Sequence, residues 1–355
     1  MAYTTIKKPS DYFNTKLYTG NSDSGDNVVA VGFQPDFTWF KSRTQGYNNY
    51  LIDAIRGDEK YISSDNTNAE ASWGANDVTW TPTGFTLNTT GGSGINEGGQ
   101  GANNMVAWNW LANGAGSANT AGSINSTVSA NTTSGFSIVK WTGTGSNATI
   151  GHGLGVAPRM IIMKNTSQTA SWGVYHESMG NDKRMFLNTT DAESAGVWQN
   201  TSPTSTVFSV DGGTITGGSG HVEIAYCFAD VQGFSKFGSY VGNGNADGTF
   251  VYTGFKPAFV MVKNVNSGAQ GWLMFDDERS PFNVANKFMV ANLSQAEAST
   301  STHTMDFLSN GFKIRGTDGG VNGSGNTIIY MAFAEQPLVG DNPATARWLC
   351  SYLLT

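Results

Sequence analysis

Short apolar or alternating runs of four to eight residues recur along the chain, each bounded by Gly, Pro, Asn or Asp. Runs of this kind predict β-strands, and their regular succession is typical of an antiparallel β-sandwich. Helical periodicity is nearly absent. The exception is the C-terminal segment, where Asn342 and Pro343 resemble a helix start. We therefore expect an all-β protein with little helix, apart from a helix in 338–355.

One pattern of glycine, proline and lysine occurs three times. A glycine stands fifteen residues before a proline in each copy, with the glycines at Gly20, Gly143 and Gly242 and the prolines at Pro35, Pro158 and Pro257. Six residues after each proline a lysine closes an apolar run, FTWFK, MIIMK or FVMVK. Because a repeated spacing indicates a repeated structural unit, we expect three tandem antiparallel β-sandwiches of lectin-like or jelly-roll-like type.

These spacings divide the chain into six segments. They are an N-terminal arm at 1–13, unit 1 at 14–111, a linker at 112–133, unit 2 at 134–231, unit 3 at 232–337 and a C-terminal segment at 338–355. The linker is assigned because Gly, Ser, Asn and Thr dominate it, a composition typical of flexible or extended connections. Since the arm precedes the repeated pattern, we expect it to dock on a partner chain.

Recurring aromatic residues predict the core of each unit. One phenylalanine recurs fifteen residues after an Ala-Glu pair, and another aromatic ends the last apolar run of each unit. We expect six buried residues: Phe85, Phe208, Phe312, Trp110, Phe228 and Phe333.

Composition and charge exclude several classes. Only 13% of the residues are charged, the formal net charge is −7, and no run is rich in Lys or Arg, which argues against nucleic-acid binding. No apolar stretch is long enough to suggest membrane insertion. Cys227 and Cys350 lie far apart, so free thiols are favoured over a disulfide, and no cysteine or histidine spacing indicates a metal.

Two charged positions recur with the units. Lys41, Lys164 and Lys263 close the apolar runs, and Glu70, Glu193 and Glu297 follow later at matching offsets. These residues form either one ion pair repeated three times within the units or simply solvated strand ends, because spacing alone cannot show proximity.

No catalytic constellation is evident. Asp53-x-x-Arg56 reappears as Asp276-x-x-Arg279, but unit 2 has His176 and Met179 at those positions, which favours a turn over an active site. The run Asp276-Asp277-Glu278 lacks the alternation of a calcium loop, and the Gly-rich loops precede strands rather than helices. We expect a protein that is not an enzyme and binds no cofactor.

Trp73, Trp80 and Trp198 lie outside the shared apolar runs, in the region after Ala-Glu. Tryptophans on loops either stack against sugars or cover the open end of a sandwich. They are our candidate glycan contacts.

The segments MAYTTIKKPSDYFNTKLYTG, GFQPDFTWFKSR, GHGLGVAPRMIIMKN and GFKPAFVMVKN resemble repeat-containing virion structural proteins of tailed bacteriophages, especially marine ones, of tail-fibre or lectin-like type. The resemblance implies a virion protein, assembled in the bacterial host cytoplasm with other virion proteins. It favours a tail-associated role with contact to host-surface polysaccharide. A capsid decoration protein and a glycan-degrading spike are the alternatives. We expect a homo-oligomer, with a trimer favoured.

Overall fold

The computed structural model describes residues 4–21, 25–74, 77–88, 94–97 and 103–337, and nearly all regular structure there is antiparallel β-sheet. In this part of the chain α1 (Gly319–Asn322) is a single turn, and the 3₁₀ helices are η1 (Pro9–Asp11) and η2 (Glu177–Met179). None of the helices in the described ranges is long and apolar enough to span a membrane. The all-β class predicted from the sequence is confirmed. The expected helix in 338–355 lies outside the described residues.

Each unit contains one large sheet, and the order of its strands is shared. In unit 1 the order is β1 (Phe13–Thr19), β9 (Asn104–Trp110), β3 (Phe37–Ser42), β4 (Tyr50–Asp53), β5 (Gly57–Ser63) and β6 (Ala71–Ser72). In unit 2 it is β12 (Phe136–Thr142), β19 (Val222–Phe228), β14 (Met160–Asn165), β15 (Gly173–His176), β16 (Lys183–Phe186) and β17 (Ser194–Ala195). In unit 3 it is β20 (Ser235–Val241), β28 (Thr327–Pro337), β22 (Phe255–Asn264), β23 (Leu273–Asp276), β24 (Lys287–Val290) and β25 (Ala298–Ser299).

A small sheet packs on each large one. Its strands are β2 (Asn27–Ala30), β8 (Gly84–Leu87) and β7 (Val78–Thr81) in unit 1, β13 (Ala148–Gly151) and β18 (Val207–Val210) in unit 2, and β21 (Phe250–Tyr252), β27 (Gly311–Ile314) and β26 (Met305–Leu308) in unit 3. Separate hydrophobic clusters fill the space between the two sheets of each unit.

The segment 112–133 is not a linker. Its strands β10 (Ser117–Asn119) and β11 (Ser126–Asn131) form a hairpin, and β11 pairs with β12, so the large sheet of unit 2 has eight strands. A hydroxyl group of this hairpin also bonds to the small sheet, from Ser126 Oγ to Gly151 O at 3.0 Å. The prediction of a flexible or extended linker is wrong.

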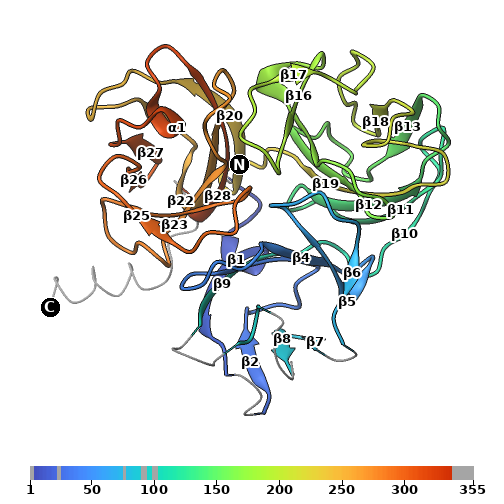
Figure 1. Cartoon of the computed structure of the whole chain (residues 1–355), viewed down its shortest axis with the longest axis horizontal. Helices are drawn as coiled ribbons and strands as arrows, with labels where there is room; N and C mark the ends of the chain where they lie inside the picture. The colour runs from blue at the N-terminus through green and yellow to red at the C-terminus, as the bar shows by residue number, and fades with distance from the viewer. Residues whose placement is uncertain (1–3, 22–24, 75–76, 89–93, 98–102, 338–355) are drawn as a thin grey trace, which may run out of the picture.

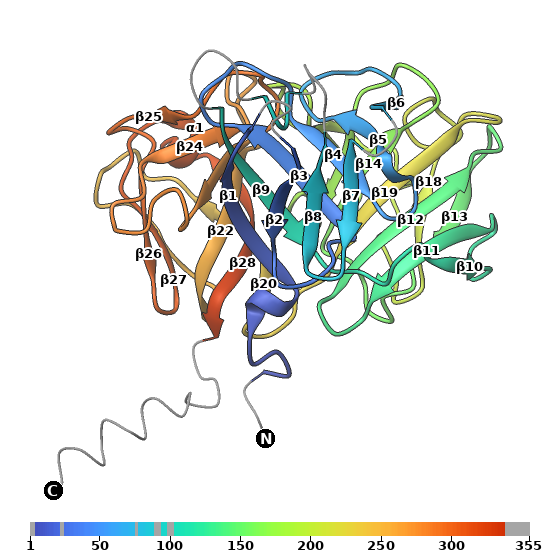
Figure 2. The ribbon, with the colours of Figure 1, turned by 90° about the horizontal axis from the view of Figure 1, so that it is seen from below.

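The three units surround a common centre, with unit 1 at the bottom of Figure 1, unit 2 at the upper right and unit 3 at the upper left. Figure 2 shows strands of units 2 and 3 on opposite sides of unit 1. One face of each large sheet carries apolar side chains into a single central cluster, to which Phe37, Phe228 and Phe333 belong. The large sheets are therefore covered on both faces, which explains their almost continuous apolar runs.

The aromatic residues predicted to be buried are all in a core. Phe85, Phe208 and Phe312 fill the sandwiches, whereas Trp110, Phe228 and Phe333 belong to the central cluster, and none is more than 2% exposed. This core prediction is confirmed.

The arm before β1 packs on its own chain. Ile6 is 1% exposed within the central cluster, and the ring of Tyr12 lies 6.0 Å from that of Phe234 in unit 3. The expectation that it docks on a partner chain is wrong for this part of the arm, because its apolar side chains cover the central core where units 1 and 3 meet.

Candidate functional site

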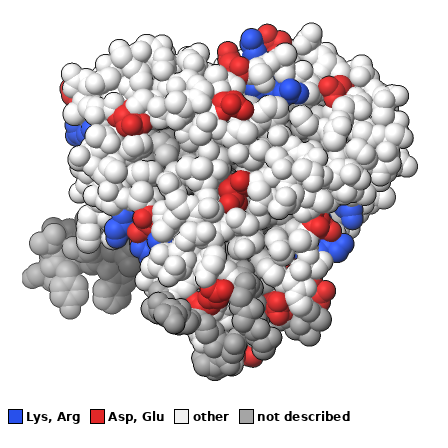
Figure 3. Space-filling view, viewed as in Figure 1, with Lys and Arg blue, Asp and Glu red and all other residues white. Residues whose placement is uncertain are grey.

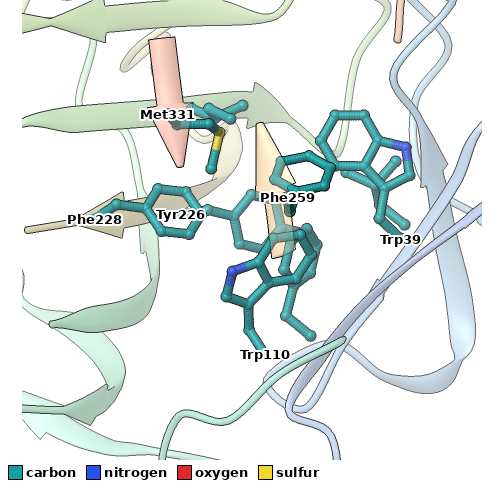
Figure 4. Close-up of a pocket in the computed structure, with 9 residues that line it drawn as sticks. Trp39, Trp110, Tyr226, Phe228, Phe259 and Met331 are labelled. Atoms are coloured by element: carbon teal, nitrogen blue, oxygen red, sulfur yellow. The ribbon is translucent and has the colours of Figure 1, made fainter. Parts of the chain in front are cut away.

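A cavity at the centre of the molecule is lined by side chains of all three units, among them Trp39, Tyr226 and Met331 (Figure 4). Its volume is about 10 Å³, which is roughly the minimum that one water needs. The lining is formed by aromatic and aliphatic side chains. We interpret it as a packing gap and not as a ligand site.

The repeated lysines are buried at the borders between units, where each Nζ donates to a backbone carbonyl of another unit. The distances are 3.3 Å from Lys164 to Thr67 O, 2.8 Å from Lys263 to Thr190 O and 2.7 Å from Lys41 to Ser294 O. Each accepting residue stands three positions before a repeated glutamate. Burial lowers the pKa of each lysine to about 8.

Two of the repeated glutamates contact the arginine of an Asp-x-x-Arg sequence, and each has a second partner of its own. Glu70 lies 3.4 Å from Arg56 and 2.9 Å from Lys60. Glu297 lies 2.9 Å from Arg43 and 3.6 Å from Arg279. Within the described ranges no ion pair joins a repeated lysine to a repeated glutamate, and none involves Glu193. The prediction of a repeated ion pair is therefore wrong.

The backbone of the same glutamates does have a shared role. Their N–H groups donate to carbonyls of the next unit, at 2.8 Å from Glu70 to Thr166, 2.9 Å from Glu193 to Val265 and 3.0 Å from Glu297 to Arg43. Together with the lysine bonds, these contacts join unit 1 to unit 2, unit 2 to unit 3 and unit 3 back to unit 1. The three units form a closed ring held by one repeated set of contacts.

The two Asp-x-x-Arg sequences also lie at these borders. Arg56 Nε is 2.5 Å from Asp53 Oδ2, and Arg279 Nε is 2.6 Å from Asp276 Oδ2, with every one of these side chains at most 1% exposed. At the third border His176 occupies the aspartate position, and its Nε2 lies 3.1 Å from Tyr330 O. Because solvent cannot reach these groups, we interpret them as structural contacts between units.

An acidic pocket of about 200 Å³ lies between the arm, unit 1 and unit 3, lined in part by Ser10, Asn14, Asp277, Glu278 and Glu335. Burial raises the pKa of Asp277 to about 8, and the neighbouring carboxylates add to this rise. No group of three or more His, Cys, Asp or Glu in the described ranges is arranged to hold a metal ion. The pocket is therefore no candidate metal centre.

The three candidate tryptophans do not form a common surface. Trp198 is 1% exposed and donates from Nε1 to Lys183 O at 3.0 Å, so it cannot contact a glycan and that prediction is wrong. Trp73 and Trp80 are half-buried, and the indole of Trp73 stacks on Tyr61 at 4.6 Å. Both pack against the sandwich core of unit 1.

An open groove of about 490 Å³ lies in unit 3. Its lining is rich in hydroxyl and amide groups and comprises Val284, Asn286, Ser299, Thr300, Ser301, Thr304 and Arg315. Phe282, two residues from the lining, is 83% exposed. Asn283 fixes this exposed segment, because its side chain bonds to both the N–H and the carbonyl of Phe307, at 2.8 Å and 2.9 Å.

The loop along the groove is also held in place. His303 stacks on Phe288 with 4.6 Å between ring centroids, and its Nε2 lies 3.0 Å from Asp318 Oδ1. Thr300 Oγ1 accepts from the N–H of His303 at 3.1 Å. The sequence signal for this site was the run ASTSTHT after Glu297, which lies in the predicted region but offers hydroxyl groups instead of tryptophan. Sequence reasoning missed these residues.

Charged side chains are few on the face seen in Figure 3 and are scattered among uncharged ones. At the groove, Arg315 is balanced by Asp306, 2.6 Å from its Nε, and by Asp247, 3.8 Å from its Nη1. The groove therefore presents hydrogen-bonding groups with little net charge, which suits an uncharged polar ligand with many hydroxyl groups.

The chain belongs to the family described as Domain of unknown function (DUF7483), whose model matches residues 8–337. A comparison with curated proteins found no match.

Proposed function

We propose that this chain is a non-enzymatic structural protein of a tailed-bacteriophage virion, associated with the tail, which contacts host-surface glycans through the groove of unit 3. The virion role rests on the resemblance of the sequence, and the observation that carries the glycan contact is the groove itself. A sugar offers hydroxyl groups to Asn286, Ser299 and Thr300, and its apolar face can pack on an exposed ring such as that of Phe282.

The closed ring supports a structural role for the rest of the chain. Buried contacts at all three borders fix the units relative to one another, so the groove is held on a rigid body. A single shallow groove gives modest affinity, and several copies on one particle sum to useful avidity.

Binding to polysaccharide from the host cell envelope tests the glycan contact. Removing the exposed ring by Phe282→Ala, or the loop hydroxyl by Thr300→Val, is expected to weaken binding at least tenfold. Val156→Ala is the matched control, because Val156 is 50% exposed in unit 2, away from the groove. Equal binding by all variants would exclude the groove, and released oligosaccharide would show an enzyme.

Antibody labelling of intact particles tests the location. Label on the tail supports the proposal. Label on the head, together with no glycan binding, would instead favour the capsid decoration role.

A further inference from the structure

In unit 2 the chain itself covers the free edge of the small sheet. Ile124 forms a parallel bridge with Ile150, and its N–H donates to Thr149 O at 3.3 Å. The outer face of the edge strand is covered as well. A Cβ atom at Gly151 would lie 2.0 Å from Asn119 Oδ1.

Among the residues that the structure describes, none covers the corresponding edge of unit 3 in this way. Strand β21 is the outermost strand of its sheet, and no strand of the described ranges pairs with it except β27. Phe250 and Tyr252 occupy the positions of Thr149 and Gly151, as judged from their pairing partners, and they are 44% and 55% exposed. Neither proline nor a charged residue, the usual protections of an edge strand, occurs from Thr249 to Thr253.

The backbone of this edge is oriented for pairing. Thr249 and Thr253 bond toward the β27 side, through Ile314 N to Thr249 O at 3.0 Å and Thr253 N to Asn310 O at 3.0 Å. Because hydrogen-bonding direction alternates along an antiparallel strand, the N–H and carbonyl groups of Phe250 and Tyr252 point away from β27.

The sequence of the edge is complementary to itself. From Thr249 to Thr253 it is Thr, Phe, Val, Tyr, Thr, which is nearly the same in both directions. In an antiparallel pair centred on Val251, Phe250 of one copy lies opposite Tyr252 of the other, and the outward backbone groups of these residues meet.

We propose that two copies of this chain associate through β21 about a two-fold axis at Val251, as a dimer in place of the trimer that the sequence favoured. The two small sheets then form one continuous sheet, and the aromatic side chains cover each other as residues 119–126 cover β13 in unit 2. In unit 1 the edge strand β2 has Val28 and Ala30 at these two positions, so it lacks the aromatic pair. This inference is independent of glycan binding.

Sedimentation of the purified full chain over a range of concentrations tests the proposal. The wild type is expected to form a dimer. The variant Phe250→Lys with Tyr252→Lys places like charges opposite each other and is expected to raise the dimer dissociation constant at least tenfold. The variant Phe250→Lys with Tyr252→Glu places opposite charges together and is expected to restore the dimer.

Two controls make the result specific. Val28→Lys introduces a charge at the equivalent strand of unit 1 and is expected to leave the dimer unchanged. Hydrogen exchange of the Phe250 and Tyr252 amides in the wild type is expected to slow as concentration rises. A wild type that stays monomeric, open-ended association, or failure of the charge pair to restore a dimer in a folded variant would overturn the proposal.

Discussion

The hydroxyl group of Tyr226 in unit 2 donates a hydrogen bond of 2.8 Å to the carboxylate of Asp53 in unit 1. The equivalent border between units 1 and 3 has Trp108 Nε1 at 3.0 Å from Asp276. At the border between units 2 and 3, Met331 is the equivalent of Tyr226 and has no hydrogen-bond donor. There His176 replaces the aspartate. A buried carboxylate requires donors, so the aspartate occurs only where the facing side chain supplies one.

Removing that donor tests the relationship. Tyr226→Phe is expected to lower the free energy of unfolding by about 1.5–3 kcal/mol, because it removes a bond to a charged group. Tyr240→Phe is the control, since the Tyr240 hydroxyl donates to a neutral acceptor, Val321 O, at 2.7 Å, and about 0.5–1.5 kcal/mol is expected. Chemical denaturation measures both, and equal losses would contradict the role of the charge.

The buried lysines are expected to hold the ring together. Lys263→Met leaves Thr190 O of unit 2 without its donor and should cost about 1–3 kcal/mol in unfolding free energy. Lys60→Met removes an ion pair whose lysine side chain is 47% exposed, so a loss of about 0–1 kcal/mol is expected. A similar small effect for both variants would argue against the inter-unit contact.

The pH dependence of stability should contain a contribution from Glu223. Burial raises the pKa of this carboxyl from 4.5 to about 9, and neither of its oxygens has a hydrogen-bond partner in the described ranges. Between these values the folded state holds a proton that the unfolded state has lost. The protonated carboxyl therefore contributes to the stability of the folded state below pH 4.5, and this contribution is lost as pH rises to about 9.

Glu223→Gln removes the ionisation while keeping the shape. The variant is expected to gain stability relative to the wild type as pH rises from about 5 to about 9. Thermal unfolding across this range measures the difference. Glu59→Gln makes the same change at an exposed side chain and is the matched control. A difference for Glu223→Gln that does not change with pH would contradict the protonated carboxyl.

The arm is expected to contribute to stability. Ile6→Ala should cost about 2–5 kcal/mol, because Ile6 is buried in the central cluster. Lys8→Ala serves as the control, since Lys8 and its partner Asp11 are exposed. If both variants unfolded at the same temperature as the wild type, the arm would have no structural role.

The shared centre predicts that the units unfold together. The ring of Phe333 in unit 3 lies 5.6 Å from Trp110 in unit 1 and 6.1 Å from Phe228 in unit 2. Phe333→Ala should therefore cost about 3–5 kcal/mol and shift one common transition. Calorimetry would show separate transitions if the units were independent domains.

The sequence predicted the strands and the core well because both depend on the alternation of apolar side chains, which is a local property. It did not predict the partners of Lys41, Lys164 and Lys263. Their acceptors are backbone carbonyls of other units. Because every residue has a backbone carbonyl, the sequence does not indicate which one accepts the bond. The repeated spacing showed that these lysines matter, whereas the direction of the contact depends on how the units pack.

The segment 112–133 and the groove illustrate a second limit. Ser and Thr suit flexible connections, edge strands and polar grooves alike, so composition cannot distinguish them. β11 is a strand because β12 offers it a free edge, and the run after Glu297 lines a groove because His303 is held by Phe288 and Asp318. In both cases a neighbour distant in sequence decides the outcome.

The contact from Glu297 in unit 3 to Arg43 in unit 1 sets the number of units the molecule can hold. In an open solenoid each added repeat finds the same vacant surface, so arrays of many lengths are stable. Here the third unit contacts the first, so the surface of the first unit that could bind another repeat is already occupied. A fourth unit could be inserted only by breaking one of the three contacts between units. Removal of one unit would expose lysines that are now buried to water. The number of units in this chain is therefore fixed by the geometry of its ring.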